Sequence, residues 1–295
     1  MPLKIIEKYT KRIPHSCLVK LQAVYDSLKT AEKKAADLLL SRPEFFANSS
    51  IVEASEAAQC SEATFVRLAQ RLGYSGYVDL KEHFSEKIAV EDNPTHLYSG
   101  ISENDDYATI ASKVFKATMQ ALEDTLEILD KKQYKEAVGA LCSSNKILLC
   151  GIGDAAAVIQ SGFQKFIRIG LNVQASPDPD VQMIYISHMK KGDVLIAVSH
   201  SGRTKSIVEA AKYAKSKDVK VISITNYPVS PLAKNSDIIL LTAAFTEHME
   251  GEIMSKRVTE LCVLESLYIN VLLKCRNKLC ESLDCSNIAL EKNKL

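Results

Sequence analysis

The chain of 295 residues is long enough to form two domains, each with its own hydrophobic core. Its 46% hydrophobic and 25% charged residues are typical of a globular protein and exclude an intrinsically disordered chain. The 37 basic residues nearly balance the 36 acidic ones, which excludes a global field that attracts nucleic acid. Any contact with DNA must therefore come from a local basic patch.

Neither the N-terminus nor any apolar run carries a membrane signal. No run approaches the roughly 18 apolar residues of a membrane span, and the opening sequence MPLKIIEKYTKRIPH lacks the apolar core of a signal peptide. The eight cysteines include no C-x-x-C pair. We therefore predict a cytoplasmic protein without membrane contact, whose eight cysteines are reduced thiols and hold neither a metal ion nor a disulfide.

Residues 50–73, SIVEASEAAQCSEATFVRLAQRLG, predict two short helices joined by a tight turn. Ser50 and Glu53 form a capping box for the first helix. Ser61 is placed to cap the second helix, and Gly73 is placed just beyond its end. Two short helices with such a turn match a helix-turn-helix.

The second of these helices separates an apolar face from a polar one. Its buried stripe follows the i, i+3, i+4, i+7 pattern: Phe65, Leu68, Ala69 and Leu72. Ser61 lies at the N-terminal end of this helix, and Thr64 lies on the flank of its polar face. Together with the residues that project from the polar face, they are the candidate DNA contacts: Ser61, Ala63, Thr64, Arg67, Gln70 and Arg71. Small residues allow close approach to base edges, while Arg67 can bind guanine or phosphate and Arg71 can bind a phosphate. The alternative is a solvated polar face on an ordinary helical hairpin.

A polar segment containing Pro94 and Gly100 divides the chain. We assign residues 1–88 to an all-α domain, 89–106 to a linker and 107–285 to a second domain with flanking helices. The second domain opens with a helical stretch over 107–141, after which strand-like and helix-like segments alternate. This alternation predicts an α/β fold with a parallel sheet.

Five short apolar runs without polar alternation predict buried parallel strands, over residues 146–150, 171–175, 193–198, 219–224 and 237–241. Helical stretches over 155–169, 181–190 and 205–217 separate the first four runs. A long amphipathic helix over 255–273 follows the last run. Ligands of such sheets bind beyond the carboxyl ends of the strands.

The sequence SHSGRT at residues 199–204 stands between the third apolar run and a helix. Its hydroxyls belong to Ser199, Ser201 and Thr204. Because a strand-to-helix turn presents free backbone N–H groups and the positive end of a helix, it predicts a phosphate site. Gly202 would let the backbone approach a ligand closely. The alternative is an ordinary helix cap with spare serines.

The segment GIGDAAA at residues 151–157 follows the first apolar run and has the form G-x-G-x-x-A. A dinucleotide site also needs an acidic residue at the end of the second strand, and the run over 171–175 has none. We therefore expect no nicotinamide site and no cofactor. A sugar or phosphate wall of the same pocket fits this segment better.

The two halves together resemble the RpiR family of bacterial transcriptional regulators, in which a helix-turn-helix domain precedes a SIS (sugar isomerase) domain. The resemblance covers about residues 20–268. It rests on SEATFVRLAQRLGYSGYVDLK (61–81), GIGDAAA (151–157), QKFIRIG (164–170), GDVLIAVSHSGRT (192–204) and VISITNYPVSPLAKNSDIIL (221–240). It implies a flavodoxin-like three-layer sandwich around a five-stranded parallel sheet.

The resemblance also implies a site for a phosphosugar effector, which comprises Gly151, Gly153, Asp154, Ser199, His200, Ser201, Gly202, Thr204, Ser255 and Arg257. Ser199, Ser201 and Thr204 would hold the phosphate, while the first two glycines would line the sugar. His200 need not point at the ligand. For Ser255 and Arg257, a helix cap and a surface charge are equally good interpretations.

Asp154 departs from the family, whose members commonly have serine at this position. A carboxylate repels a phosphate and competes for the same helix end. Either Asp154 faces sugar hydroxyls, or the ligand differs from the usual one, or Asp154 caps its helix. We favour the cap.

The resemblance implies a regulator of sugar metabolism genes that is not an enzyme, with repression favoured by its frequency in the family. Such a regulator would bind operator DNA as a homodimer or tetramer and change its DNA affinity with the phosphosugar. The rival is an aldose–ketose phosphosugar isomerase, with acid–base candidates Glu247, His248, Glu250 and Glu252. A third interpretation is a ligand-binding adaptor that contacts another protein through its helical domain.

Overall fold

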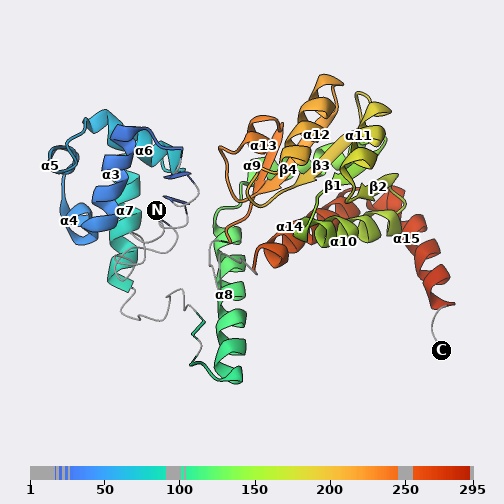
Figure 1. The fold of residues 1–295 in the computed structure, drawn as a ribbon, viewed down its shortest axis with the longest axis horizontal. Helices are drawn as coiled ribbons and strands as arrows, with labels where there is room; N and C mark the ends of the chain where they lie inside the picture. The colour runs from blue at the N-terminus through green and yellow to red at the C-terminus, as the bar shows by residue number, and fades with distance from the viewer. Residues whose placement is uncertain are drawn as a thin grey trace. The chain divides into compact units, whose positions relative to one another are not determined.

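The computed structural model describes residues 17, 20, 21, 24, 25, 27–90, 101, 102, 104–244 and 255–292, without the side chains of 83, 85–90 and 278. The chain forms two compact units, Met1–Gly100 and Ile101–Leu295 (Figure 1). The division falls inside the predicted linker over 89–106.

The N-terminal unit contains the helices α3 (Thr30–Ser41), α4 (Pro43–Asn48), α5 (Ile51–Ala57), α6 (Glu62–Arg71) and α7 (Tyr77–Val90). Its core centres on the ring of Phe46, whose centroid lies 6.0 Å from that of Phe65 and 5.2 Å from that of Phe84. The predicted apolar stripe of α6 is confirmed, because Phe65, Leu68, Ala69 and Leu72 are all buried in this core. Burial of this stripe fixes which face of α6 remains exposed.

Local sequence signals set the ends of α5 and α6. Glu53 N–H donates to Ser50 Oγ at 3.3 Å, and Ser50 N–H donates to Glu53 Oε2 at 2.7 Å, which confirms the capping box. Ser61 is the N-cap of α6, as predicted, although its hydroxyl caps no backbone N–H. Gly73 follows α6 with φ of 84°, a conformation that glycine adopts without strain.

The C-terminal unit contains a five-stranded sheet in the order β2-β1-β3-β4-β5, in which every pair is parallel. Its strands are β1 (Ile147–Cys150), β2 (Val173–Ser176), β3 (Val194–Val198), β4 (Lys220–Thr225) and β5 (Ile238–Leu241). All five overlap the predicted apolar runs. From β1 the strand order proceeds to β2 on one side and to β3 on the other, so the order reverses between β1 and β3. Such a switch point is where ligands bind in open α/β sheets.

Helices cover both faces of this sheet, which confirms the three-layer sandwich (Figure 1). One layer contains α9 (Lys131–Ser143), α10 (Asp154–Arg168) and α14 (Ser255–Lys274). The opposite layer contains α11 (Pro179–Ser187), α12 (Lys205–Ser216) and the short α13 (Pro231–Lys234). The last helix, α15 (Arg276–Glu291), contacts α10 and α14.

The helical stretch predicted over 107–141 is two helices, α8 (Tyr107–Glu127) and α9. Asp130 divides them, because its carboxylate accepts hydrogen bonds from the N–H groups of Lys132 at 2.8 Å and Gln133 at 3.1 Å. An aspartate that caps a helix in this way favours a new helix start. None of the described helices is both long and apolar enough to cross a lipid bilayer.

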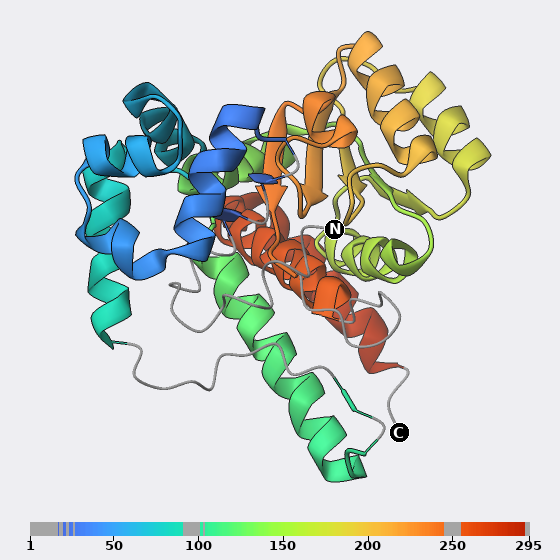
Figure 2. The same cartoon turned by 60° about the vertical axis from the view of Figure 1, so that its left-hand side comes forward.

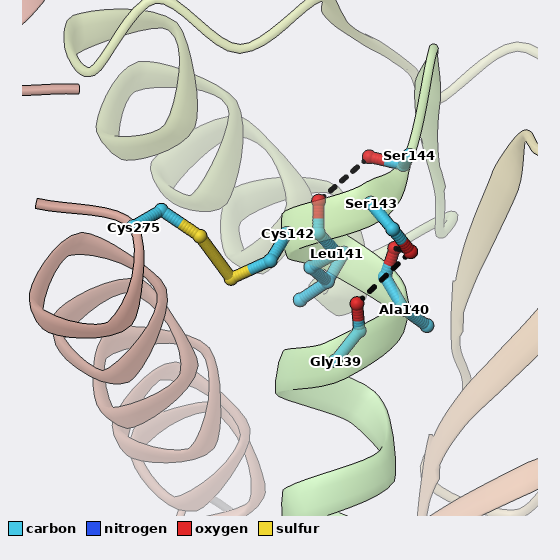
Figure 3. The surroundings of a disulfide bond; sticks show 7 residues. All are labelled: Gly139, Ala140, Leu141, Cys142, Ser143, Ser144 and Cys275. Carbon is cyan, nitrogen blue, oxygen red and sulfur yellow. Dashed lines mark hydrogen bonds between the residues drawn. A yellow bond between two sulfur atoms is a disulfide. The ribbon is translucent and has the colours of Figure 1, made fainter. Parts of the chain in front are cut away.

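The prediction of eight reduced thiols is wrong for two cysteines. Cys142, near the end of α9, and Cys275, which follows α14, form a disulfide with their Cα atoms 6.4 Å apart (Figure 3). The two residues are 133 positions apart in the chain, so their spacing gave no sequence signal. The other six cysteines are free thiols.

Candidate functional site

A cavity of about 240 Å³ opens at the carboxyl ends of β1 and β3. Its lining comes from four segments: the turn after β1, the loop after β3, the start of α10 and the start of α14. The lining residues are Ile152, Asp154, Ala155, Val198, Ser199, His200, Ser201, Thr204, Lys256 and Glu260. The cavity therefore lies at the predicted switch point of the sheet.

The SHSGRT loop contributes hydroxyl groups to this cavity. Ser199 is buried, and its Oγ lies 2.9 Å from Oγ1 of Thr204. Ser201 Oγ accepts a hydrogen bond from the N–H of Arg203 at 3.2 Å. Thr204 is the N-cap of α12 but makes no side-chain cap bond. The first N–H groups of α12 therefore receive no hydrogen bond from the side chain of their N-cap residue, and with the hydroxyls they can bind an anion.

Gly202 serves the loop in a different way from the one predicted. Its φ is 61°, and a Cβ at this position would collide with the side chain of Ser230. Its carbonyl also accepts a hydrogen bond from Leu232 N–H at 3.0 Å. Gly202 thus allows the loop to pack on the start of α13, and it does not line the cavity.

The backbone glycines of the GIGDAAA segment also shape the site without lining it. A Cβ on Gly151 would lie 3.0 Å from Ala155 Cβ and from Ile159 Cγ2, so the missing side chain permits close packing of α10. Gly153 is the N-cap of α10, with φ of 59°.

Asp154 does not cap its helix, contrary to the interpretation favoured from sequence. It is the first residue of α10, and the N-cap position belongs to Gly153. The carboxylate instead pairs across the cavity with α14: Oδ2 lies 2.7 Å from Lys256 Nζ, and Oδ1 lies 3.8 Å from Arg257 Nη1. The hydrogen bond from Lys256 holds the pKa of Asp154 below its usual value.

Two lining residues, Lys256 and Glu260, were absent from the sequence prediction. They are four positions apart near the start of α14, so they share one face of the helix. The spacing is present in SKRVTE, but the sequence prediction for this segment named Ser255 and Arg257. Ser255 is fully buried and Arg257 is partly exposed, and neither lines the cavity.

Glu260 is 1% exposed, and its Oε1 has no hydrogen-bond partner among the residues that the structure describes. Burial raises the pKa of Glu260 to about 8. The positive charge of Lys256 opposes this shift, whereas the negative charge of Asp154 adds to it. The carboxyl is consequently protonated at neutral pH and can donate a hydrogen bond into the cavity.

His200 also lines the cavity, and both of its ring nitrogens are buried without a hydrogen-bond partner in the described part of the chain. Burial and the nearby Lys256 lower its pKa to about 4, so the ring is neutral at pH 7. Thr225 Oγ1 and Asn226 N–H donate to the His200 carbonyl at 3.1 Å and 3.0 Å, which fixes the backbone of the loop. A neutral imidazole and a protonated carboxyl therefore offer both donors and acceptors for uncharged polar groups.

In the N-terminal unit, Ser61, Ala63, Arg67 and Gln70 are exposed on α6, as predicted. Thr64 is buried, and its Oγ1 lies 2.9 Å from Ser61 Oγ and accepts a bond from Arg67 Nη2 at 3.3 Å. Thr64 therefore orients its neighbours and is not itself presented to solvent.

Arg71 does not project from the domain, contrary to the prediction. Its Nη1 lies 2.9 Å from Glu32 Oε2, and its Nη2 donates to Ser27 Oγ at 2.9 Å. Burial disfavours the charged form of Glu32 and acts to raise its pKa. The hydrogen bond from the Lys29 N–H and the charge and hydrogen bond of the Arg71 guanidinium outweigh this effect, so the pKa of Glu32 is held below its usual value. Arg71 fastens α6 to the start of α3. The acid–base candidates Glu247, His248, Glu250 and Glu252 lie outside the described residues.

Comparison with known protein families assigns both units. The model of the helix-turn-helix domain of the rpiR family matches residues 15–91, and the model of the SIS domain matches residues 140–270. A curated helix-turn-helix transcriptional regulator from Thermotoga maritima is 34% identical over 278 residues, which are 93% of this chain and 98% of that protein. The chain belongs to the RpiR family of transcriptional regulators.

Other relatives agree with this assignment. The transcriptional regulator HexR of Escherichia coli is 29% identical over 250 residues, which cover 85% of this chain and 86% of HexR. A solved structure of the Vibrio vulnificus NanR protein, complexed with ManNAc-6P, has the same fold with a TM-score of 0.59. It is 24% identical, and the match covers 94% of this chain and 99% of NanR.

Proposed function

We propose that this RpiR-family regulator binds operator DNA through α6 and a phosphosugar effector in the cavity between β1 and β3. The effector shifts the equilibrium between arrangements of a homodimer or tetramer, and thereby changes DNA affinity. A repressor of sugar metabolism genes, acting in the cytoplasm without a cofactor, fits this scheme. Residues 1–88 would form the DNA-binding domain, 89–106 the linker and 107–285 the effector domain.

The observation that best supports an effector site in this cavity is that three anion-binding features meet there. Ser199, Ser201 and Thr204 supply hydroxyls, α12 supplies an N-terminus without a side-chain cap, and Lys256 supplies a positive charge. A phosphate at this position would gain charge-assisted hydrogen bonds. Asp154 forms an ion pair with Lys256, so a phosphate must compete with this carboxylate.

The sugar end of the ligand would face Glu260 and His200. Glu260 is buried and His200 is partly buried, both are uncharged at neutral pH, and each has a buried polar atom without a hydrogen-bond partner among the described residues. Unpaired buried polar atoms cost stability, and hydroxyl groups of a bound sugar would satisfy them. This supports a polyhydroxylated ligand rather than a bare phosphate ion.

The DNA-binding proposal rests on the exposed face of α6, which carries Ser61, Ala63, Arg67 and Gln70. The small residues lie at the N-terminal end of the helix, where recognition helices approach the bases. Arg67 supplies the positive charge of this face. Arg71 supports the helix from behind through Glu32.

A thermal-shift screen against sugar phosphates and their unphosphorylated parents tests the effector site. A ligand present at about 100 times its Kd stabilises the protein by roughly 2.7 kcal/mol. A shift with a phosphosugar that is absent for its parent sugar supports the proposal. The same compound should then change the affinity for operator DNA, measured by fluorescence anisotropy.

One observation keeps an aldose–ketose isomerase as a second candidate. The cavity holds a carboxyl group and an imidazole, Glu260 and His200, and proton transfer in isomerisation uses such groups. Turnover of a phosphosugar panel by the wild-type protein, lost in Glu260→Gln, would favour the enzyme. Binding without turnover would favour the regulator.

A further inference from the structure

Asn226 directly follows β4, the strand between β3 and β5, and it contacts the segments that follow both of these neighbours. Its backbone N–H donates to the carbonyl of His200 at 3.0 Å, in the SHSGRT loop after β3. Its side chain is fully buried and contacts residues 242–244, which follow β5. Asn226 therefore joins one wall of the candidate effector cavity to a segment on the other side of β4.

The side-chain amide of Asn226 binds both ends of residues 242–244. Its Nδ2 donates to the Ala244 carbonyl at 3.1 Å. Its Oδ1 accepts from Thr242 Oγ1 at 2.8 Å and from the Ala244 N–H at 3.0 Å. The segment is buried, and a buried backbone group without a partner is costly. An asparagine suits this position because its amide both donates and accepts hydrogen bonds.

Thr125 binds the middle of the same segment from the last turn of α8. Its Oγ1 accepts a hydrogen bond from the Ala243 N–H at 3.0 Å and donates to the Ala121 carbonyl at 2.7 Å. In both views this end of α8 lies close to the sheet, while its N-terminal end extends away from it (Figures 1 and 2). The hydrogen bonds thus continue from the cavity wall through residues 242–244 into α8.

The groups in this series of hydrogen bonds depend on one another. Opening of the SHSGRT loop takes the acceptor away from the Asn226 N–H, and displacement of residues 242–244 leaves the Asn226 amide without its partners. Because unpaired polar groups are costly when buried, such contacts open together more readily than one at a time. A ligand that binds only the closed loop would therefore hold the whole series closed.

The helix at the far end of this series is the first helix of the C-terminal unit. It begins directly after the predicted linker over residues 89–106. Regulation of DNA binding by an effector requires that occupancy of the cavity alters an element outside it. Along the chain, α8 is the element of this unit that is nearest to the N-terminal unit.

We propose that Asn226 and Thr125 are positioning residues that couple occupancy of the effector cavity to α8. An anion held by the SHSGRT loop keeps the His200 carbonyl on Asn226, which keeps residues 242–244 on Thr125. The inference rests on the effector site of the proposed function. Its test reports on the cavity and on α8 separately, so the two can fail independently.

Hydrogen exchange of the full chain tests this coupling, with inorganic phosphate as the probe and sodium chloride of equal ionic strength as the reference. With phosphate at about ten times its measured dissociation constant, opening of a loop that binds it only when closed becomes about tenfold rarer. Deuterium uptake should therefore slow in residues 199–204 and, to a similar extent, in residues 121–127. Packing against a neighbour would not by itself make α8 respond to an anion in the cavity.

Substitutions at Thr125 separate coupling from a merely structural role. Thr125→Val removes the hydroxyl at nearly constant size, so phosphate should still slow exchange in residues 199–204 but no longer in residues 121–127. Thr125→Ser keeps the hydroxyl and should retain both responses. Thr118→Val is the matched control, because the Thr118 hydroxyl donates to the Val114 carbonyl at 2.9 Å within α8. It should respond as the wild type does.

Asn226→Ala tests the other end of the series. It removes the side-chain amide but keeps the N–H that donates to His200, so it should also confine the response to residues 199–204. Asn235→Ala is its control, because the Asn235 amide donates to the Pro231 carbonyl at 2.8 Å beside α13 and should not affect either response. If Asn226→Ala does not fold, the Thr125 variants decide the question.

Each outcome separates the coupling from the effector site. Slowing confined to residues 199–204 in the wild type overturns the coupling and leaves the effector site intact. Retained slowing in residues 121–127 of Thr125→Val also overturns it, because the response would then pass through α14, which contacts both the cavity and α8. Absence of slowing in residues 199–204 refutes the effector site of the proposed function and the coupling with it.

Discussion

Lys256 Nζ lies 2.7 Å from Asp154 Oδ2, and this ion pair joins the first turns of α14 and α10 across the mouth of the candidate effector cavity. The lysine that would bind a phosphate is therefore already neutralised by a carboxylate. A serine at this position would take this negative charge away from Lys256. The pair consequently sets how strongly the cavity attracts an anion.

The first prediction follows from this pair. Asp154→Ser should tighten the binding of a phosphosugar by about tenfold, because it removes a negative charge from beside Lys256 and from the phosphate site. Calorimetric titration with the effector measures the change. Asp180→Asn, which alters an acidic residue in the first turn of α11, is the control and should leave the affinity unchanged. Weaker binding by Asp154→Ser would mean that the carboxylate contacts the ligand.

Loss of one hydroxyl from the SHSGRT loop should weaken the effector. Ser201→Ala should reduce phosphosugar affinity by about 1–3 kcal/mol, because the phosphate loses one donor. Ser216→Ala, at the far end of α12, provides the control for loss of a serine hydroxyl. DNA affinity without effector should stay at the wild-type value in both variants. An unaltered effector affinity in Ser201→Ala would place the phosphate elsewhere.

Arg67 should carry the charge-dependent part of DNA binding. Arg67→Ala is expected to lower operator affinity by more than tenfold, with a shallower dependence on salt, because one phosphate or base contact is lost. Anisotropy titrations at several salt concentrations measure both effects. Lys220→Ala removes a positive charge from the start of β4 and serves as the control. Equal operator binding by wild type and Arg67→Ala would exclude α6 as the recognition helix.

Arg71 should matter for stability rather than for recognition. Arg71→Ala leaves the Glu32 carboxylate, whose side chain is 6% exposed, without its guanidinium partner. The free energy of unfolding in urea should fall by about 2–3 kcal/mol. The double variant Arg71→Ala/Glu32→Gln should recover part of this loss, because it also removes the buried charge. A loss below about 0.5 kcal/mol in Arg71→Ala would show that the pair contributes little.

These residues show how far the sequence alone could predict the structure. Local patterns sufficed for the helix-turn-helix and for the sheet, because capping boxes, positive-φ glycines and unbroken apolar runs act over a few neighbouring residues. The SHSGRT loop was found for the same reason: strand, hydroxyls and helix adjoin in the chain. Asp130 shows that even a helix boundary can be overlooked inside a strong helical pattern.

Contacts between distant segments could not be predicted in this way. Arg71 faces Glu32 across 39 positions, Asp154 faces Lys256 across 102, and Cys142 bonds to Cys275 across 133. No periodicity in the sequence connects such distant residues. Because arginine and aspartate occur both at exposed positions and in internal ion pairs, the residue type alone does not reveal the pairing. Their roles depend on the packing of α3, α10 and α14. Glu260 was missed because a glutamate inside a helix carries no local sign of burial.

Glu260 gives the final prediction, which concerns pH. Its pKa is about 8 in the folded protein against an ordinary value of 4.5, so the folded state holds this proton more tightly than the unfolded chain. The stability contributed by the neutral carboxyl is fully present below pH 4.5 and is lost as the pH rises through 8. His200, with a folded pKa of about 4, acts in the opposite direction and only on the acid side. Between about pH 7 and 9, comparison with a variant that cannot lose a proton at position 260 therefore isolates Glu260 from His200 and from the thiols.

Urea unfolding at several pH values tests this expectation. From about pH 7 to 9 the free energy of unfolding of the wild type should fall, by about 1 kcal/mol or more, relative to that of Glu260→Gln. The glutamine keeps the size of the side chain and cannot lose a proton, so the variant lacks this pH dependence. Glu265→Gln, on the same helix and 40% exposed, should follow the wild type. Parallel pH profiles for wild type and Glu260→Gln would show that Glu260 is charged in the folded protein, and would remove the neutral donor from the cavity.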